Sequence, residues 1–311
     1  MYVFDGRITL EDRQLLEDYL GGCEYKTSGL SYTSLFMWKD INEYSWEIIG
    51  DYMCITGSDN LDPLNDDPFM LVPLTRTGEY EAEGLRYTIM EAKSRFEKIG
   101  KKFNMMLVPF HLLEVLLKAM PGELEYKADR PNYDYVYDTK DLIELRGRAF
   151  HSKKNHLNYF KNHYEYEYVK LTHDMADEAM LFIREFNERK NLQDPHEKQL
   201  LDSEERAMRD VFDHLEDVGY LSGAIRIDNK IEALSVGGKL GKKTVTVHIE
   251  KANIEYRGLY QAINNEFCKA MASNVKRINR EEDMGLPGLR KAKLSYNPVR
   301  LVEKYTILVK K

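Results

Sequence analysis

Residues 221–300 read LSGAIRIDNKIEALSVGGKLGKKTVTVHIEKANIEYRGLYQAINNEFCKAMASNVKRINREEDMGLPGLRKAKLSYNPVR. Apolar and polar residues alternate over 221–227 and again over 244–250, which is the period of a half-buried strand. Between them, Asp228-Asn229 tolerates positive φ and predicts a hairpin turn into a return strand. Apolar residues then recur at helical spacing over 259–270. The stretch predicts three consecutive strands, a helix, a further strand and a basic segment.

The further strand, Arg277–Glu281, is unusually polar. Strand interiors favour β-branched and aromatic residues, so alternating side chains here would put Asn279 and Glu281 on one face. Charged residues are common on exposed edge strands, which is one interpretation. The other is a polar cleft, and it gains from the basic residues that follow at 290–293, because these could neutralise buried carboxylates.

Three segments carry a resemblance to a known family: FHSKKNHLNYFKNHY at 150–164, HIEKANIEYRGLYQAINNEF at 248–267 and INREEDMGLPGLRKAKLSYNPVRLVEKY at 278–305. Together they resemble the soluble relatives of the phosphatidylglycerol lysyltransferase C-terminal domain. That family is similar to the peptidoglycan aminoacyltransferases and has two GCN5-related N-acetyltransferase (GNAT)-like domains in tandem. The resemblance therefore implies an α/β fold with mixed sheets and two tandem GNAT-like, acyl-CoA N-acyltransferase domains.

The order of expected elements independently predicts a tandem duplication. Residues 46–56 form a hairpin, followed by a strand at 69–74, a helix at 81–99, a strand at 105–108, a helix at 111–120 and a strand at 133–137. The same order recurs roughly 170 positions later and ends with a strand at 302–309. We therefore expect an N-terminal domain at 1–143 and a C-terminal domain at 144–311, with a basic connecting segment at 146–163. Residues 187–202 are expected to form a loop, and Ser203 to cap a helix.

Composition limits the class of protein. The 311 residues carry a formal net charge of −7, so contact with nucleic acid would need a local basic patch. The three cysteines are scattered and predict neither a disulfide framework nor a zinc site. No signal peptide or membrane-spanning run is visible, and we expect a cytoplasmic protein of undetermined oligomeric state.

The candidate active site lies in the second half. An amine nucleophile must be bound near a carboxylate that can take its proton, so Glu250, Glu281 and Asp283 are the candidate catalytic groups. Alternation places Glu250 on the same face of its strand as His248. Candidate substrate-binding side chains are His248, Tyr260, Asn279, Arg290, Lys293 and Tyr296. The alternative is a closed structural network that pairs Glu281 with Arg290 and Asp283 with Lys293.

Two segments could bind an anion. Coenzyme-A enzymes of the fold use a Q/R-x-x-G-x-G/A turn before the helix at 259, but Glu255 and Tyr260 depart from that pattern. Arg257 and Gly258 could still bind an anion at the helix start, or simply form a turn with a surface arginine. In the basic segment, Lys153, Lys154 and His156 could contact phosphates, and a solvated linker helix is the alternative. The histidine spacing predicts no metal site.

Three functions remain open. The resemblance implies an acyl- or aminoacyltransferase that moves an activated acyl group to an amine or hydroxyl acceptor. Its donor could be an aminoacyl-tRNA held by the basic patch, and its acceptor a small molecule, lipid or peptide. The second reading is a coenzyme-A-dependent N-acetyltransferase. The third is a ligand-binding module that uses the same fold without turnover.

Overall fold

The computed structural model describes residues 2–22, 26–58, 67–190 and 195–310. The chain forms two compact units: residues 1–134 with 302–311, and residues 135–301. The sequence predicts a division at 143/144. In the structure, the strand and helix just before that point lie in the second unit, and the last strand lies in the first. The polar sequence at 58–67 predicts a loop, and most of that segment lies outside the described residues.

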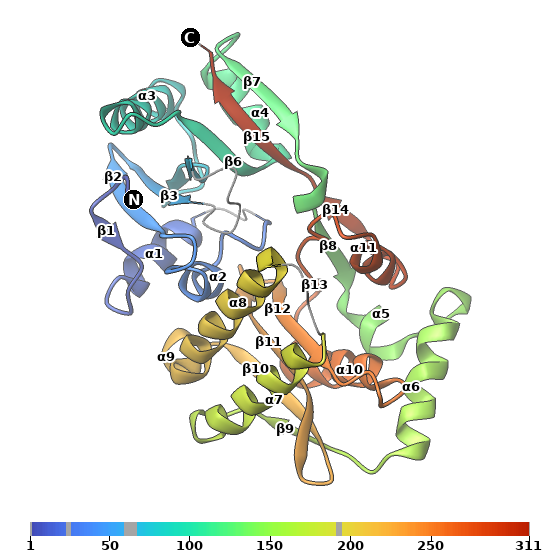
Figure 1. The fold of residues 1–311 in the computed structure, drawn as a ribbon. Coiled ribbons are helices and arrows are strands. Elements are labelled where there is room, and N and C mark those ends of the chain that lie inside the picture. Colours follow the sequence, from blue (N-terminus) through green and yellow to red (C-terminus); the bar gives the residue numbers. More distant parts are fainter. Residues whose placement is uncertain (1, 23–25, 59–66, 191–194, 311) are drawn as a thin grey trace. The chain divides into compact units, whose positions relative to one another are not determined.

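The first unit contains a mixed sheet of eight strands among the described residues, in the order β1-β2-β3-β4-β6-β15-β7, with β5 beside β3 (Figure 1). Neighbouring strands are antiparallel, except that β4 and β6 are parallel. The strands are β1 (Gly6–Arg7), β2 (Ser45–Ile49), β3 (Tyr52–Ser58), β4 (Pro68–Met70), β5 (Leu74–Thr75), β6 (Asn104–Pro109), β7 (Leu124–Ala128) and β15 (Lys304–Val309). The helices are α1 (Arg13–Leu20), α2 (Tyr32–Met37), α3 (Ala82–Lys98) and α4 (Phe110–Ala119).

The second unit contains a sheet of seven strands among the described residues, in the order β14-β8-β13-β12-β11-β10-β9. Its strands are β8 (Asp134–Asp138), β9 (Glu167–Lys170), β10 (Leu221–Ile227), β11 (Lys230–Leu240), β12 (Thr244–Ala252), β13 (Arg277–Asn279) and β14 (Arg300–Val302). Asp228 and Asn229 have φ of 51° and 62° and form the predicted hairpin turn. Two consecutive glycines are expected to end the return strand at Gly237-Gly238, but β11 continues to Leu240.

Helices cover both faces of the second sheet. One face packs against α5 (Thr139–Glu144), α6 (His151–His163) and α10 (Leu259–Met271), through a core that includes Phe160, Phe267 and Val247. On the other side, α7 (Ala176–Glu188) contacts β11 and packs against α8 (Pro195–Asp213). The short α9 (Leu215–Val218) follows α8, and α11 (Pro287–Leu294) lies between β13 and β14 in the chain.

The two units share a strand order that confirms the repeated pattern but changes its last step. In each unit an antiparallel pair leads to a parallel pair, β3-β4-β6 in the first and β11-β12-β13 in the second. The strand beside β6 is β15, and the strand beside β13 is β8. The prediction that the strand at 133–137 completes the first sheet and the strand at 302–309 the second was therefore wrong. Each half gives its last strand to the other half's sheet, a choice of partner that the alternation of a buried strand does not encode.

The prediction of a loop to residue 202 was also wrong. The helix α8 begins at Pro195, residues 191–194 lie outside the described part, and Ser203 is buried inside the helix instead of capping it. Proline is favoured in the first turn of a helix because its missing N–H would have no helical partner there.

Candidate functional site

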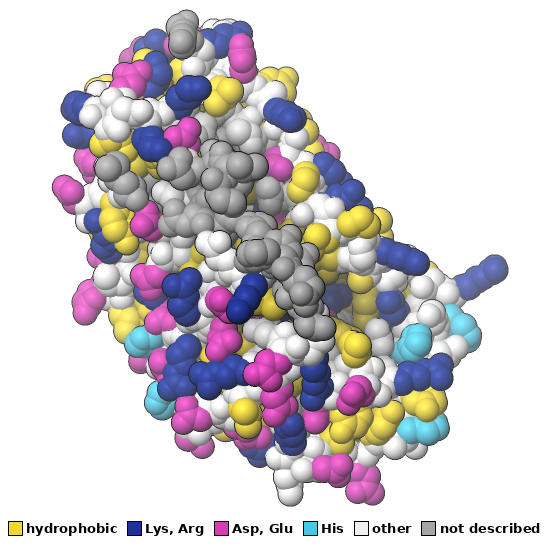
Figure 2. All heavy atoms as spheres, in the orientation of Figure 1, with side chains coloured by type: hydrophobic (Ala, Val, Ile, Leu, Met, Phe, Trp, Pro, Cys, Tyr) yellow, Lys and Arg dark blue, Asp and Glu magenta, His cyan; other side chains and the backbone are white. Residues whose placement is uncertain are grey.

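The helix α6 is the basic segment of the sequence, and it packs against the start of α10. Its buried residues Leu157 and Phe160 join the core of the second unit, while Lys154 and Lys161 are exposed. Figure 2 shows histidine and basic side chains gathered over α6, at the right of the view. One face of the helix is therefore structural, and the other offers positive charge to solvent.

The turn before α10 is closed by α6. Gly258 has φ of 91°, and a Cβ built on it would lie 2.2 Å from the backbone oxygen of His156. The guanidinium of Arg257 lies over the ring of Tyr159, 4.3 Å from its centroid. The backbone of α6 thus packs closely against the N-cap residue of α10, and this packing restricts space at the helix start, where an anion would have to bind. This arrangement favours the structural reading of Arg257 and Gly258.

A β-bulge in β12 separates side chains that the sequence placed together. Gly237 pairs with Val247 and Val236 pairs with Ile249, so His248 is an extra residue in its strand. A bulge of one residue reverses the alternation beyond it. His248 contacts Glu281, whereas Glu250 accepts a hydrogen bond from Asn264 of α10. The expectation that His248 and Glu250 share one face is corrected by this bulge.

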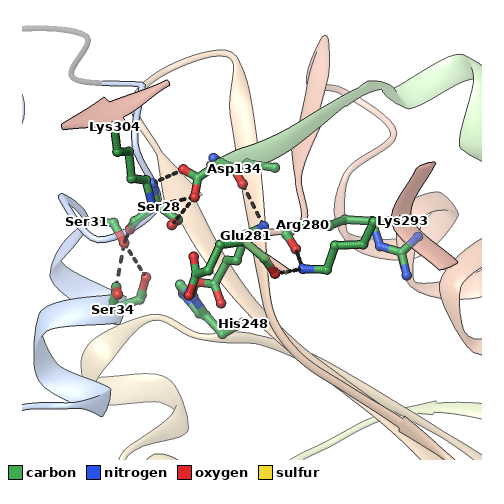
Figure 3. A network of polar contacts seen from close by, with 12 residues as sticks. Ser28, Ser31, Ser34, Asp134, His248, Arg280, Glu281, Lys293 and Lys304 are labelled. Atoms are coloured by element: carbon green, nitrogen blue, oxygen red, sulfur yellow. Dashed lines mark hydrogen bonds and ion pairs between the residues drawn. The ribbon is translucent and has the colours of Figure 1, made fainter. Parts of the chain in front are cut away.

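His248 and Glu281 form a hydrogen-bonded pair (Figure 3). The Nδ1 atom of His248 lies 2.8 Å from Oε1 of Glu281, and the side chains are 0% and 16% exposed. Glu281 lies just past β13 with φ of 57°, and its N–H donates to Oδ1 of the buried Asn279 at 2.8 Å. Left-handed backbone is costly for a residue other than glycine, and such residues cluster at functional sites. Three predicted site residues therefore meet at one strained bend.

Asp283 belongs to a closed polar network instead. Its fully buried carboxylate accepts two hydrogen bonds from Arg290, both at 2.8 Å, and one from the Tyr135 hydroxyl at 2.6 Å. The ammonium of Lys293 donates to the backbone oxygens of Arg280 and Glu282. Arg290 therefore pairs with Asp283, in place of the pair with Glu281 weighed from the sequence, and these groups brace the bend that carries Glu281.

Glu250 lies at the centre of a second polar group, under α10. Its Oε1 accepts from Nη2 of Arg280 at 2.8 Å, and its Oε2 accepts from Asn264 at 2.8 Å. The guanidinium lies 4.8 Å from the ring centroid of Tyr296. Burial by itself disfavours the Arg280 cation, but Glu250 outweighs that effect and raises the arginine pKa. Burial also raises the pKa of Tyr296 to about 12, against the opposing effect of Arg280.

Two further predicted residues flank this group. The Lys153 ammonium lies 4.4 Å from the ring centroid of Tyr296, and burial together with Arg280 lowers the lysine pKa. Tyr260 is partly buried, and burial raises its pKa against an opposing effect of the Ala252 backbone. The structure thus brings Lys153 and Tyr296 to Glu250, while the exposed Lys154 points elsewhere on α6.

Sequence reasoning missed Arg280 and Asn264. Arg280 was assigned to the opposite face of its strand from the expected site and left out. A usable signal existed, since Arg280 alternates with the apolar Ile278, which faces the core beneath α10. A charged residue on that face needs a buried partner, and Glu250 provides it.

The first unit has its own buried ion pair, separate from these groups. The Lys304 ammonium lies 2.6 Å from Oδ1 of Asp134, and their side chains are 2% and 0% exposed (Figure 3). Ser28 donates to the same carboxylate from its backbone N–H at 2.7 Å and from its hydroxyl at 3.0 Å. The pair joins the residue that begins β8 to the residue that begins β15.

Within the described part of the chain, every helix is too short or too polar to cross a bilayer. Comparison with a curated protein gives a partial match to an uncharacterised protein of Mycoplasmoides gallisepticum, 26% identical over 179 residues. That match covers 57% of this chain, and 56% of the relative's length.

Solved structures match over nearly the whole chain. A conserved protein of unknown function from Bacteroides thetaiotaomicron is 29% identical, with a TM-score of 0.89 and full coverage of both chains. The L-PGS structure from Bacillus licheniformis is 11% identical, with a TM-score of 0.68 over 98% of this chain and 93% of that one. A tandem GNAT protein from the clavulanic acid biosynthesis pathway is 10% identical, with a TM-score of 0.54 and coverage of 97% of each chain. The last two likenesses establish the tandem GNAT-like fold.

The family model described as "Phosphatidylglycerol lysyltransferase, C-terminal" matches residues 23–308. That span includes the second sheet, the first sheet apart from β1 and the last residue of β15, the His248–Glu281 pair and the group around Glu250. The chain therefore belongs to the phosphatidylglycerol lysyltransferase C-terminal family.

Proposed function

We propose that this protein is an aminoacyltransferase that takes its acyl group from an aminoacyl-tRNA and passes it to an amine or hydroxyl acceptor. Family and fold point to an acyl- or aminoacyltransferase. The observation that carries the choice of donor is the contact of His156 with Gly258. A coenzyme-A thioester would need its pyrophosphate at this helix start, and the close packing of α6 on Gly258 supports a different donor.

We assign the base that assists the acceptor's attack to Glu281, at the strained bend after β13. The nucleophile approaches the ester carbonyl, a new amide or ester bond forms, and the bond to the tRNA 3′-terminal ribose oxygen breaks. Glu281 accepts the proton lost by the nucleophile, since its carboxylate reaches solvent while His248 orients it from the buried side. The proton then passes to the departing ribose oxygen. Most of the remaining acceleration comes from positioning and electrostatic stabilisation.

The exposed face of α6 suits the RNA part of the donor. Lys154 is exposed on a helix without acidic residues, and Arg148 is exposed just before it. Phosphate contacts by such groups give affinity that falls steeply with salt and carries little sequence preference. The acceptor is a small molecule, a lipid or a peptide that presents an amine or hydroxyl group.

The test is a transfer assay with the purified protein. It uses tRNA charged with radiolabelled amino acids, one at a time, and a panel of phosphatidylglycerol vesicles, short peptides and free amines. The proposal expects label to move to one acceptor, and to move less from the variant Glu281→Gln. Acetyl-CoA serves as the competing donor in a parallel arm.

The outcomes separate the three functions. Transfer from acetyl-CoA but not from charged tRNA would overturn the proposal in favour of an N-acetyltransferase. Saturable binding of charged tRNA without turnover on any acceptor would favour a binding module. Label transfer from tRNA with an unaffected Glu281→Gln variant would keep the donor and remove the assigned base.

A further inference from the structure

Two cations share one aromatic ring in the second unit. The Arg280 guanidinium and the Lys153 ammonium lie 4.8 and 4.4 Å from the ring centroid of Tyr296. Each contact is favourable by itself, because the face of an aromatic ring is electron-rich. Two like charges held near each other are unfavourable, more so where little water screens them.

The protein supplies one negative charge against these two. Glu250 is the carboxylate of the group, and both of its oxygens are engaged, one by Arg280 and the other by Asn264. Among the described residues, Lys153 forms no ion pair. The group formed by Arg280, Lys153 and Glu250 therefore has one excess positive charge. The Arg280 side chain is only 13% exposed, so water screens this charge poorly.

The same group holds buried polar atoms with unused hydrogen-bonding capacity. Nη1 of Arg280 is buried and has no hydrogen-bond partner among the described residues, and the same holds for Oγ of Ser235. Ser235 stands directly opposite Glu250 in the pairing of β11 with β12. A buried polar group without a hydrogen-bond partner is unfavourable, and more so when the group is charged. An oxyanion would answer both features, because its negative charge balances the group and its oxygen accepts a hydrogen bond from Nη1 of Arg280.

We propose that Nη1 of Arg280 and the ammonium of Lys153 bind one monoanionic oxyanion beside the Tyr296 ring. The flexible stem of Lys153 lets its ammonium meet the anion, while Arg280 is fixed by Glu250 and presents Nη1. A single negative charge balances the group, so the ligand is a carboxylate or a phosphodiester. A carboxylate would come from an amino acid or peptide, and a phosphodiester from RNA or a phospholipid.

The test uses two small probes of equal charge, acetate and dimethyl phosphate. Each is titrated into the full-length protein, with arginine and lysine side chains isotopically labelled for NMR, at constant ionic strength. The proposal expects saturable changes at one arginine and one lysine resonance with one or both probes. The preferred probe identifies the source of the anion. This binding measurement needs no acyl transfer, so the proposed function and the anion site fail separately.

Variants fix the location. Lys153→Gln should weaken binding of the preferred probe at least about tenfold, the effect of losing a charge-assisted hydrogen bond. Lys140→Gln removes the same charge from an exposed position of α5, and this variant should bind like the wild type. Arg280→Lys keeps a cation for Glu250 but loses the planar guanidinium, and should also bind more weakly. Absence of saturation with both probes, or equal weakening by Lys153→Gln and Lys140→Gln, would overturn the proposal.

Discussion

Nδ1 of His248 and Oε1 of Glu281 lie 2.8 Å apart, and the two side chains differ in their exposure to solvent. The imidazole is fully buried, and the carboxylate is 16% exposed. A bulge in β12 presents the histidine, and a left-handed residue after β13 presents the glutamate. The pair is therefore built by two local irregularities of neighbouring strands, and it exposes a carboxylate, rather than an imidazole, to solvent.

Glu281→Gln tests this assignment. Glutamine keeps the shape and a hydrogen bond to His248 but cannot accept a proton, so transfer should fall about 10²–10⁴-fold with little change in melting temperature. Glu255→Gln, on the exposed turn before α10, is the matched control and should transfer normally. A loss of several kcal/mol in the free energy of unfolding of Glu281→Gln would instead make the pair structural.

Asp283→Asn should behave in the opposite way. Its carboxylate is fully buried and pairs with Arg290, which is 36% exposed and stays partly hydrated when the pair is broken. We expect a loss of about 2 kcal/mol in the free energy of unfolding, less than for a pair with both members buried. Chemical denaturation measures it. Unchanged stability with reduced ligand binding would return Asp283 to the catalytic set.

Gly258→Ala tests the contact that closes the start of α10. Alanine at φ of 91° is strained, and its Cβ would also meet the His156 carbonyl at 2.2 Å. Gly241→Ala is the matched control, because φ is 63° there and a Cβ would meet nothing within 4 Å. Strain alone costs about 1 kcal/mol, so Gly258→Ala should lose clearly more stability than Gly241→Ala. Equal losses in thermal denaturation would contradict the close packing of α6 on this turn.

Lysine reactivity should change differently with pH at two positions of α6. Burial and Arg280 lower the pKa of Lys153. Burial disfavours the ammonium of Lys161 as well, but its 2.8 Å hydrogen bond to Glu266 outweighs this and raises its pKa. Lys153 should therefore lose its proton at lower pH, and acetylation by a trace reagent should begin there first as pH rises. Mass spectrometry of the labelled peptides measures both midpoints, and the reverse order would contradict the arrangement.

Lys304→Ala should destabilise the first unit strongly. It leaves the Asp134 carboxylate without its cation at a site where both side chains are almost completely buried. Breaking such a pair costs about 3–5 kcal/mol, which chemical denaturation would detect. Arg86→Ala breaks the exposed pair with Glu123 and should leave stability nearly unchanged. A loss no larger than that of Arg86→Ala would show that Lys304 is dispensable.

Local signals predicted the elements of this fold well. The Asp228-Asn229 turn, the helix from Leu259 and the duplicated element order follow from chemistry that acts within a few residues. The exchange of β8 and β15 did not follow, because a strand's alternation fits either sheet. The candidate site was predicted only in part, because the sequence does not show how neighbouring strands pair. A bulge at His248 and a left-handed Glu281 depend on the partners of their strands, and both change where side chains point.

The exchange of strands has a consequence for synthesis. The second unit is one continuous stretch, residues 135–301, so all of its strands have been made once that stretch leaves the ribosome. The first sheet must wait, because the strand between β6 and β7 is β15, at residues 304–309. Domains generally fold from the N-terminus during translation. Here the first sheet is the last to be completed. Its strands β6 and β7 are synthesised early, but β15, which pairs with both, is synthesised only after the second unit.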